Sequence, residues 1–398
     1  MRFTLGREQQ DTVNASVPFY RNSYEQVMQI AGLAGTGKSV VLNAIAERLN
    51  IRKEEIAAMA FIGQAAIIMR LKGFRNAKTI HSWLFKPTDE QIVDMHGNPI
   101  YDTYHNRPKI QLGFEPKALE GIRLMIIDEG GTVPRSMKKE IESRGIKIIV
   151  AGDLGQLPPV DDEPAYLYEG KIHYITEVMR QKAGSNILYL AHRARLGLPI
   201  QYGYYGDCLV IDEDDLTDQM LLGSDIIICG KNKTRDVINK RVRRLLGFNT
   251  DLPMQGERMV CRKNNWNIEV DGINLANGLI GTVLNSPGID GFDGTSYKIN
   301  FRPNMLHSPF IDLRCDYNYL IAPYEQKAFL KNNKYAKGLE KLEFAYAITC
   351  HLSQGGTYHS GIYIEEYLSK EIQNNLNYTG ITRFANGLIY VKRKRKFY

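Results

Sequence analysis

The sequence has few cysteines, no internal repeat, no low-complexity tract and no long apolar run. Its five cysteines are widely separated and form no C-x-x-C pair, which argues against a zinc ribbon or a disulfide framework and fits a reducing compartment. The most apolar stretch, Ile56 to Leu71, is interrupted by Gly63-Gln64 and is too short to span a bilayer. The start, MRFTLGREQQ, lacks an apolar signal core. We therefore expect a soluble cytoplasmic protein without a membrane partner.

The charge balance is mildly basic and does not identify a partner. The net charge is +7, and part of the excess lies in KRKRKF, from Lys392 to Phe397. A basic balance suits a polyanion, but a solvated charge run explains such a tail as well. A chain of 398 residues with 43% hydrophobic content is long enough for about two to four packed domains.

The strongest local motif is GLAGTGKS, from Gly32 to Ser39, which fits G-x-x-x-x-G-K-[ST]. A short apolar strand ends at Ala31, and Val40 to Leu49 have helical apolar spacing. In this context the backbone N–H groups of the loop point at phosphate oxygens, at the positive end of the next helix. Lys38 is expected to reach the outer phosphates and the Ser39 hydroxyl to hold Mg²⁺. The motif predicts ATP and Mg²⁺ as ligands.

Two further strand ends carry polar groups suited to hydrolysis. RLMIIDE places Asp128 and Glu129 at the carboxyl edge of a buried sheet, beside the phosphate loop. One carboxylate can hold Mg²⁺ while the other orients or deprotonates a water. In IKIIVAGDLGQLPPV, Gln156 is the candidate to sense the terminal phosphate, and Pro158 with Pro159 stiffens the exit from the loop.

The order of elements predicts an α/β fold with two sheet domains, each carrying an insertion. Residues 92–104 (IVDMHGNPIYDTY) are typical of two short strands around the turn His96-Gly97-Asn98-Pro99. A β-rich stretch with several turn signals, from Gly256 to Tyr319, predicts a small barrel inserted in the second domain. The strands expected in the parallel sheets are 29–31, 57–61, 124–127, 147–151, 173–175, 225–229, 344–349, 360–364 and 387–391, and Lys233 to Leu246 is expected to be a basic helix.

Taken in order, the motifs resemble those of a known family. LGREQQ, GLAGTGKS, TIHSWL, IIDEGG, GDLGQLPPV, MRQ, FAYAITCHLSQGGTY and YTGITRFANGLIYV follow one another along the chain. This series resembles the superfamily-1 helicases of the B subgroup, the RecD-like and phage Dda-like enzymes. The resemblance implies two RecA-like domains, 1A over 1–85 and 118–179 and 2A over 180–264 and 341–398. It also implies a hairpin domain 1B over 86–117 and an SH3-like insertion 2B over 265–340, where NGLIGTV resembles a family signature.

The resemblance assigns roles around ATP. Lys38, Ser39, Asp128 and Glu129 would form the hydrolytic centre, with Ser39 and Asp128 on the metal. Gln156, Arg180 and Arg383 would contact the γ-phosphate, the two arginines from across the cleft, because a planar guanidinium stabilises charge spread over phosphoryl oxygens. The remaining nucleotide contacts are expected from Gln9, which would read adenine, and from Gly32, Gly35, Thr36, Gly37 and Gly355.

A second set of residues would contact DNA. Short hydroxyl, amide and imidazole groups suit phosphate contacts that form and break without reading sequence. The expected contacts are Thr79, His81, Ser82, Pro158, Thr349, His351, Ser353 and Gln354. His81 and His351 are alternatively core or cap histidines, and Trp83 and Phe85 could stack on a base or pack in a core. The turn at His96, Gly97 and Asn98 would be the tip of a strand-separating pin.

Two departures from the family pattern stand out. Gly130-Gly131 follows DE where a small residue and a serine are usual, which questions how hydrolysis is coupled to domain movement. Leu352 replaces the usual lysine and removes an expected charge on the DNA backbone.

The sequence therefore predicts an ATP-dependent DNA helicase that moves 5′ to 3′ on single-stranded DNA and unwinds fork DNA as a monomer. A single-strand-binding protein and replication proteins are the expected protein partners. Two alternatives stay open: an RNA helicase or RNA-dependent ATPase, and a nucleotide-gated DNA-binding or loader protein that does not unwind.

Overall fold

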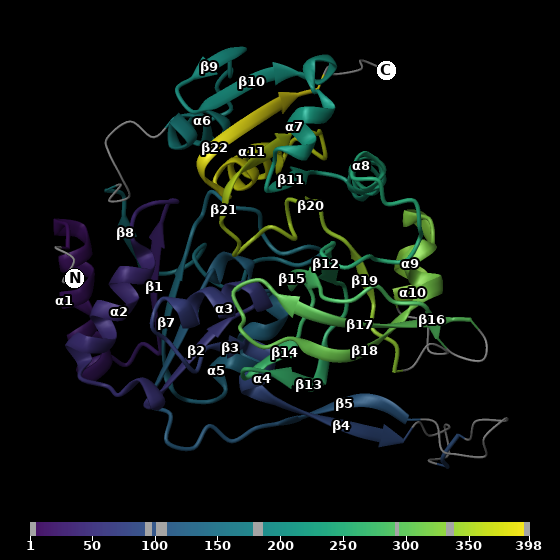
Figure 1. Cartoon of the computed structure of the whole chain (residues 1–398). Coiled ribbons are helices and arrows are strands. Elements are labelled where there is room, and N and C mark those ends of the chain that lie inside the picture. The colour runs from purple at the N-terminus through teal and green to yellow at the C-terminus, as the bar shows by residue number, and fades with distance from the viewer. Residues whose placement is uncertain are drawn as a thin grey trace.

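The computed structural model describes residues 5–91, 98–100, 110–177, 186–290, 294–331 and 338–393. It confirms an α/β architecture built on two parallel sheets and one antiparallel sheet (Figure 1). Arg180, His96 and Gly97, three residues with predicted roles, lie outside the described residues.

The first parallel sheet holds the phosphate loop. Its strands pair in the order β3-β2-β6-β7-β1-β8, all parallel. The strands are β1 (Val27–Gly32), β2 (Ile56–Ala60), β3 (Lys78–Thr79), β6 (Leu124–Asp128), β7 (Lys147–Gly152) and β8 (Ile172–Ile175). The predicted strands of this sheet are confirmed to within a few residues.

Both faces of this sheet are buried, as its continuous apolar runs require. Ile126 and Ile149 face a core shared with α1, α2 and α3, whereas Met125 and Ile148 face a core on the opposite side. The helices of this half are α1 (Arg7–Asn22), α2 (Lys38–Leu49), α3 (Gly63–Leu71), α4 (Ile80–Leu84) and α5 (Lys138–Glu142).

The second sheet has the order β20-β11-β21-β22-β10-β9. Only its edge strand β9 is antiparallel to its neighbour. The strands are β9 (Gly203–Tyr205), β10 (Cys208–Asp212), β11 (Ile226–Cys229), β20 (Ala347–Thr349), β21 (Tyr358–Ile364) and β22 (Phe384–Lys392). Its helices are α6 (Asn186–Arg195), α7 (Asp218–Leu222), α8 (Asn232–Leu245) and α11 (Gln373–Ile381).

A two-stranded antiparallel hairpin extends from the first sheet domain (Figure 1). β4 (Phe85–Gln91) pairs with β5 (Ile110–Pro116) from Phe85↔Pro116 to Gln91↔Ile110. These strands flank the predicted strands and turn of residues 92–104, most of which lie outside the described residues. Asn98, at the predicted turn, is exposed.

The third sheet is antiparallel and lies beside the hairpin (Figure 1). It contains β12 (Arg258–Cys261), β15 (Ile280–Val283), β16 (Ile289–Asp290), β17 (Ser296–Pro303), β18 (Phe310–Asp316) and β19 (Leu342–Phe344), with β13 (Asn265–Val270) and β14 (Ile273–Leu275) as a separate pair. Two short helices, α9 (Tyr317–Ile321) and α10 (Tyr324–Lys331), follow β18.

The predicted strand 344–349 was wrong as a single element. Leu342–Phe344 pairs antiparallel with β12, and Ala347–Thr349 pairs parallel with β11, so two sheets meet in this stretch. The antiparallel sheet consequently reaches past the predicted insertion bounds at both ends, because β12 and β19 pair with each other.

Candidate active site and nucleic-acid interface

The phosphate loop connects β1 to α2. Gly35 and Gly37 have φ of 86° and 80°, a region that favours glycine. Lys38 Nζ donates hydrogen bonds to the carbonyl oxygens of Gly32, at 2.7 Å, and Leu33, at 3.0 Å. The lysine therefore curls back over its own loop, where a cradle for phosphate is expected.

Gln9 fixes the loop from α1. Its Nε2 donates to the Thr36 carbonyl at 2.8 Å, and its Oε1 accepts from the Gly6 N–H at 3.0 Å. A Cβ at position 37 would lie 2.5 Å from Gln9 Nε2, so this close approach requires Gly37. In this arrangement both polar atoms of the Gln9 amide, the predicted adenine reader, are hydrogen-bonded to backbone groups.

The two predicted carboxylates lie at the end of β6. Asp128 is buried, and its Oδ1 accepts from the Glu129 N–H at 2.9 Å. Glu129 has φ of 54°, a strained conformation for a non-glycine residue of the kind found at functional sites. Burial raises the pKa of Glu129, and Asp128 raises it further, while Arg383 and Lys38 oppose the rise. Residues from both sheet domains thus act on one carboxyl group.

Close packing explains Gly130 but not Gly131, where a Cβ would make only ordinary contacts, 3.6 Å from the Asp153 carbonyl oxygen. A Cβ at position 130 would lie 2.2 Å from Val150 Cγ1 and 3.3 Å from the Ala151 carbonyl. The backbone after Glu129 therefore passes too close to β7 for a side chain at this position.

Gln156 and Arg383 face this centre from different domains. Gln156 is buried, and its Oε1 has no hydrogen-bond partner among the described residues. Arg383 is also buried, and its guanidinium donates to the carbonyl oxygens of Thr379, at 3.0 Å, and Gly356, at 3.3 Å. An unpaired buried amide oxygen is costly unless a ligand or water meets it.

The residues present fit ATP and Mg²⁺. The positive φ of Gly35 and Gly37 gives the loop a conformation in which backbone N–H groups can face a phosphate, and the buried Gln156 Oε1 needs a donor such as a bound water. The hydroxyl of Ser39 and the carboxylate of Asp128 are hard oxygen donors, and Mg²⁺ is commonly held by one or two such groups together with substrate phosphates. No cluster of three or more His, Cys, Asp or Glu side chains occurs in the described part of the chain, so a metal cage made by protein alone is absent there.

Sequence reasoning missed a set of contacts between α11 and the loop after β7. Asn375 Nδ2 donates to the carbonyls of Gly155, at 3.1 Å, and Gln156, at 3.0 Å, and Thr379 Oγ1 accepts from the Leu157 N–H at 2.9 Å. Thr379 and the loop residues lie within motifs that the sequence already marked, YTGITR and GDLGQLPPV, whereas Asn375 lies just before the first of these. The pairing itself has no local signal.

The first group of predicted DNA contacts gathers around α4. Thr79 caps the helix by accepting from the Ser82 N–H at 3.2 Å, and Ser82 Oγ bonds Asn274 Oδ1 of the antiparallel region at 3.0 Å. Thr79, Ser82 and Asn274 line a narrow hollow between the two regions. These hydroxyls therefore sit where the first sheet domain meets the insertion.

His81 belongs to an aromatic cluster, which we define as Phe61, His81, Phe85, Phe114 and Trp266. The ring centroids of His81 and Trp266 are 5.8 Å apart, and those of Phe114 and Trp266 are 6.3 Å apart. Burial lowers the pKa of His81, which favours the neutral ring at neutral pH. The aromatic cluster joins the first sheet domain, the β4–β5 hairpin and the β13–β14 pair.

Trp83 and Phe85 differ in their surroundings. Trp83 Nε1 donates to the Ala58 carbonyl at 2.8 Å, and its ring packs against the core of the first sheet domain. Phe85 is only partly buried and stacks beside Phe114 at 6.1 Å. Core packing therefore accounts for Trp83.

The second group of predicted DNA contacts follows β20. Thr349 is buried at the strand end, and His351 is half-buried with a pKa lowered by burial. Ser353 is fully buried and donates to the Cys350 carbonyl at 2.7 Å, and Gln354 Nε2 donates to the Leu157 carbonyl at 2.8 Å. In this arrangement Ser353 and Gln354 hold the protein together and present no exposed surface to a nucleic acid.

Three neighbouring residues complete this region. Leu352 packs against the core of the second sheet and approaches Gly278, at the NG turn of the insertion, so a hydrophobic contact replaces the family's lysine. Gly355 has φ of 75°, and a Cβ there would lie 2.7 Å from Ala65 Cβ, which explains the glycine by close packing of the two domains. Pro158 is half-buried.

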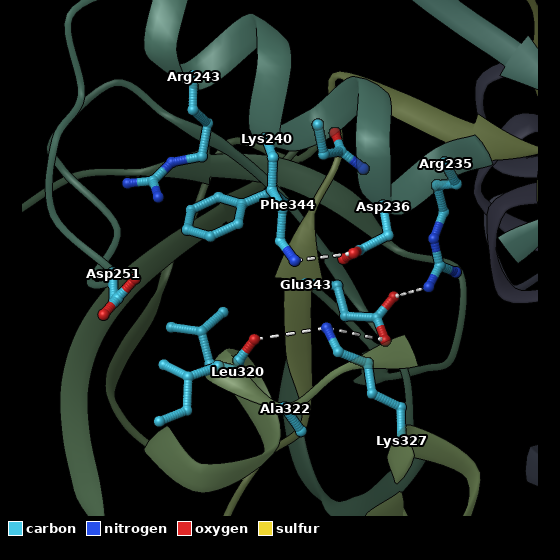
Figure 2. A pocket seen from close by; sticks show the side chains of 12 residues that line it. Arg235, Asp236, Lys240, Arg243, Asp251, Leu320, Ala322, Lys327, Glu343 and Phe344 are labelled. Atoms are coloured by element: carbon cyan, nitrogen blue, oxygen red, sulfur yellow. Dashed lines mark hydrogen bonds and ion pairs between the residues drawn. The ribbon is translucent and has the colours of Figure 1, made fainter. Parts of the chain in front are cut away.

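A separate hollow of about 90 Å³ lies between α8, the α9–α10 segment and β19 (Figure 2). Its charges are paired internally: Arg235 Nη2 meets Glu343 at 2.8 Å, and Lys240 meets Asp236 at 2.9 Å. Arg243 stacks on Phe344 and pairs with Glu257 at 2.7 Å. This hollow is lined by none of the residues around the phosphate loop.

A family model described as an AAA domain matches residues 4–205, just over half of the chain. The chain belongs to the AAA domain family. This AAA domain protein is 27% identical over 173 residues to the ATP-dependent DNA helicase Pif1 of Psychrobacter and 28% identical over 164 residues to the ATP-dependent DNA helicase RRM3 of Saccharomyces cerevisiae. Each match covers 39% of this chain but only 25% and 21% of those relatives, so the AAA domain protein spans about a quarter of their length.

Solved structures show the same fold across nearly the whole AAA domain protein. A structure of two coordinating Pif1 helicases at forked double-stranded DNA has a TM-score of 0.56 at 17% identity and covers 98% of this chain and 92% of its own. Bacteroides Pif1 bound to single-stranded DNA has a TM-score of 0.55 with the same identity and coverage. The predicted resemblance to superfamily-1 helicases of the B subgroup is confirmed. Within the described ranges, no helix combines the length and the apolar character needed to cross a membrane.

Proposed function

We propose that this protein is an ATP-dependent DNA helicase that moves 5′ to 3′ along single-stranded DNA. The observation that carries the proposal is the convergence at Glu129, where Asp128 and Lys38 of the first sheet domain and Arg383 of the second all act on one half-buried carboxyl group. A site divided between two domains couples hydrolysis to their relative movement. The relatives named as DNA helicases support this assignment.

In the proposed reaction, Lys38 and the loop N–H groups hold the phosphates, and Ser39 with Asp128 would hold Mg²⁺. Bound Mg²⁺ would neutralise charge that develops on the phosphate oxygens. Glu129 orients the attacking water and accepts its proton. The unpaired Oε1 of Gln156 can accept from that water, while its Nε2 donates to the terminal phosphate. Arg383 stabilises the transition state from across the cleft, together with Arg180 at its predicted place.

For the nucleic acid, we propose a path along the boundary between the first sheet domain and the insertion. Thr79, His81 and Ser82 of the first sheet domain, with Thr349 and His351 of the second sheet domain, supply short polar groups for backbone contacts. Phe85, Phe114 and Trp266 add partly exposed rings on which bases can stack.

The hairpin and the antiparallel sheet would then act as domain 1B and an SH3-like domain 2B. We propose that the β4–β5 hairpin carries a wedge, with its tip at His96, Gly97 and Asn98, that blocks the second strand while the motor pulls the first. Its base is braced through Phe114, which touches both Phe85 and Trp266.

A fork-unwinding assay tests the proposal. Forks with either a 5′ or a 3′ single-stranded tail are incubated with ATP and Mg²⁺, and ATP hydrolysis is measured with matched DNA and RNA strands. We expect DNA-stimulated hydrolysis and unwinding of the 5′-tailed fork. Stimulation by RNA alone would favour the RNA helicase, and opening of the 3′-tailed fork alone would reverse the assigned polarity.

Deleting Met95 to Pro99 separates the motor from the wedge. We expect this variant to hydrolyse ATP with DNA as the intact protein does, but to lose unwinding. Unchanged unwinding would place the wedge elsewhere, and an intact protein that binds DNA and ATP without unwinding would favour a loader.

A further inference from the structure

Tyr378 connects three parts of the active-site cleft through a single buried hydroxyl. It lies on α11 of the second sheet domain and is 1% exposed. Its Oη accepts from the Ala34 N–H of the phosphate loop at 2.8 Å and donates to Asp153 Oδ2 at 2.8 Å. One side chain of the second domain thus bonds both the phosphate loop and the loop after β7.

The partners of this hydroxyl are themselves fixed. Asp153 is buried, and its other oxygen accepts from the Gly155 N–H at 2.8 Å. A Cβ on Gly155 would lie 2.7 Å from the Tyr378 ring, so the ring packs directly on that backbone. Burial raises the pKa of Tyr378, and the neighbouring Asp153 carboxylate raises it further. The hydroxyl therefore stays protonated and able to donate.

Arg383, the proposed transition-state arginine, is hydrogen-bonded to the residue next to Tyr378. Arg383 Nε donates to the carbonyl of Thr379, the residue next to Tyr378, at 3.0 Å. The Tyr378 hydroxyl therefore connects the segment that holds Arg383 to the phosphate loop and to the loop after β7.

We propose that Tyr378 is a positioning residue that sets Arg383 relative to the phosphate loop and so links the arrangement of the two domains to hydrolysis. This inference rests on the proposed ATPase function. Removing the hydroxyl leaves the nucleotide cradle in the first domain complete, because Lys38 and the loop glycines are untouched. Without this hydroxyl, α11 is held less firmly against the phosphate loop, and Arg383 then occupies its catalytic position less often.

The same geometry admits a simpler view, in which the hydroxyl only stabilises the fold. Tyr363→Phe is the matched control for this view. Tyr363 is fully buried and its hydroxyl donates to Asn377 Oδ1 at 2.8 Å, so it also contacts α11, but this bond stays within the second domain. Both substitutions remove one buried hydroxyl and keep the ring.

The experiment compares the intact protein, Tyr378→Phe and Tyr363→Phe in DNA-stimulated ATP hydrolysis, binding of a fluorescent ADP analogue and thermal unfolding. We expect Tyr378→Phe to lower kcat by about tenfold, as the loss of a charge-assisted hydrogen bond of the active arrangement implies. The Kd for the ADP analogue and the KM for ATP should stay within about twofold, while Tyr363→Phe lowers the unfolding temperature similarly and keeps kcat.

Equal kcat values for the two variants would overturn the positioning role, as would a loss of kcat in Tyr378→Phe matched by weaker binding of the ADP analogue. Threonine or serine at 378 cannot span the distance, so Tyr378→Thr should be no better than Tyr378→Phe. Failure of the proposed function gives a different result, because the intact protein itself would then show no DNA-stimulated hydrolysis.

Discussion

Replacing Arg383 by lysine separates its catalytic role from its structural one. Arg383 is 5% exposed, and its guanidinium donates to the Thr379 carbonyl, the Gly356 carbonyl and Thr382 Oγ1 at 3.0 to 3.3 Å. Among the described residues Arg383 forms no ion pair, although it acts electrostatically on Glu129. A lysine keeps the charge but loses the planar fork that matches a phosphoryl group.

The two consequences have different magnitudes. Hydrogen bonds from a charged guanidinium contribute about 1.5 to 3 kcal/mol each, and the lysine ammonium restores most of them, so we expect the free energy of unfolding to fall by about 1 to 3 kcal/mol. An arginine that stabilises a phosphoryl-transfer transition state contributes about 10³-fold or more in kcat, which corresponds to about 4 kcal/mol. The loss of activity should therefore far exceed the loss of folded protein.

The assay measures kcat at saturating ATP and single-stranded DNA, together with urea unfolding. Arg243→Lys is the control, because Arg243 is also buried and bidentate, on Glu257 at 2.7 and 2.9 Å, but lines the separate hollow of Figure 2. We expect it to lose stability and keep kcat. If Arg383→Lys stays folded and retains kcat to within about tenfold, Arg383 does not act on the transferred phosphoryl group.

Further outcomes follow from the same geometry. Glu129→Gln should abolish hydrolysis yet raise the unfolding temperature at neutral pH, because a raised pKa means that the ionised carboxylate is disfavoured in the folded state; thermal scans should show this gain shrinking as the pH falls and Glu129 becomes protonated in the parent. For the same reason, hydrolysis by the parent should decline on acidification at a pH above the ordinary range of a glutamate, which a pH–rate profile measures. Trp266→Ala opens the aromatic cluster, so fork unwinding should fall more than DNA-stimulated hydrolysis, and an equal loss in both assays would contradict a role in the wedge. Removing divalent cations with EDTA should stop hydrolysis, and Ser39→Ala should raise the Mg²⁺ concentration needed to restore it.

The buried parallel strands could be predicted from the sequence because their residues are apolar on both faces. Continuous apolar runs such as IIVA, from Ile148 to Ala151, are typical of strands covered on both sides, and the structure confirms them. The stretch 344–349 failed for the opposite reason. It is also continuous and apolar, and nothing in its local pattern marks the point where Phe344 leaves one sheet and Ala347 enters another.

The residues of the site also divide into those whose grouping the sequence predicts and those whose contacts it does not. Asp128, Glu129 and the phosphate loop are set by short segments of chain, so their grouping follows from motif and sheet order. The bond between Ala34 and Tyr378 joins residues 344 positions apart, and its donor is a backbone N–H with no residue-type signal. Gln354 and Ser353 show the converse, since a polar side chain expected to contact DNA is instead buried against protein.

The attachment of the antiparallel sheet indicates which contacts must change when the cleft opens. β19 and β20 are separated only by Ala345 and Tyr346, so the antiparallel sheet is joined to the second sheet by a short, hydrogen-bonded connection. Its contacts with the first domain are made by side chains, through Arg70 to the Asp271 and Gly272 carbonyls, Ser82 to Asn274, and the rings around Trp266.

Movement between the two parallel sheets must therefore be absorbed at these side-chain contacts and not within the antiparallel sheet. Thr79, His81 and Ser82 lie at this same boundary, because Thr79 and Ser82 line the hollow next to Asn274. We therefore expect a change around Glu129 to be transmitted to the residues predicted to hold the nucleic-acid backbone. Disrupting this boundary with Arg70→Ala should leave ATP binding intact and weaken the dependence of hydrolysis on DNA; unchanged stimulation in that variant would show that the coupling runs through another part of the molecule.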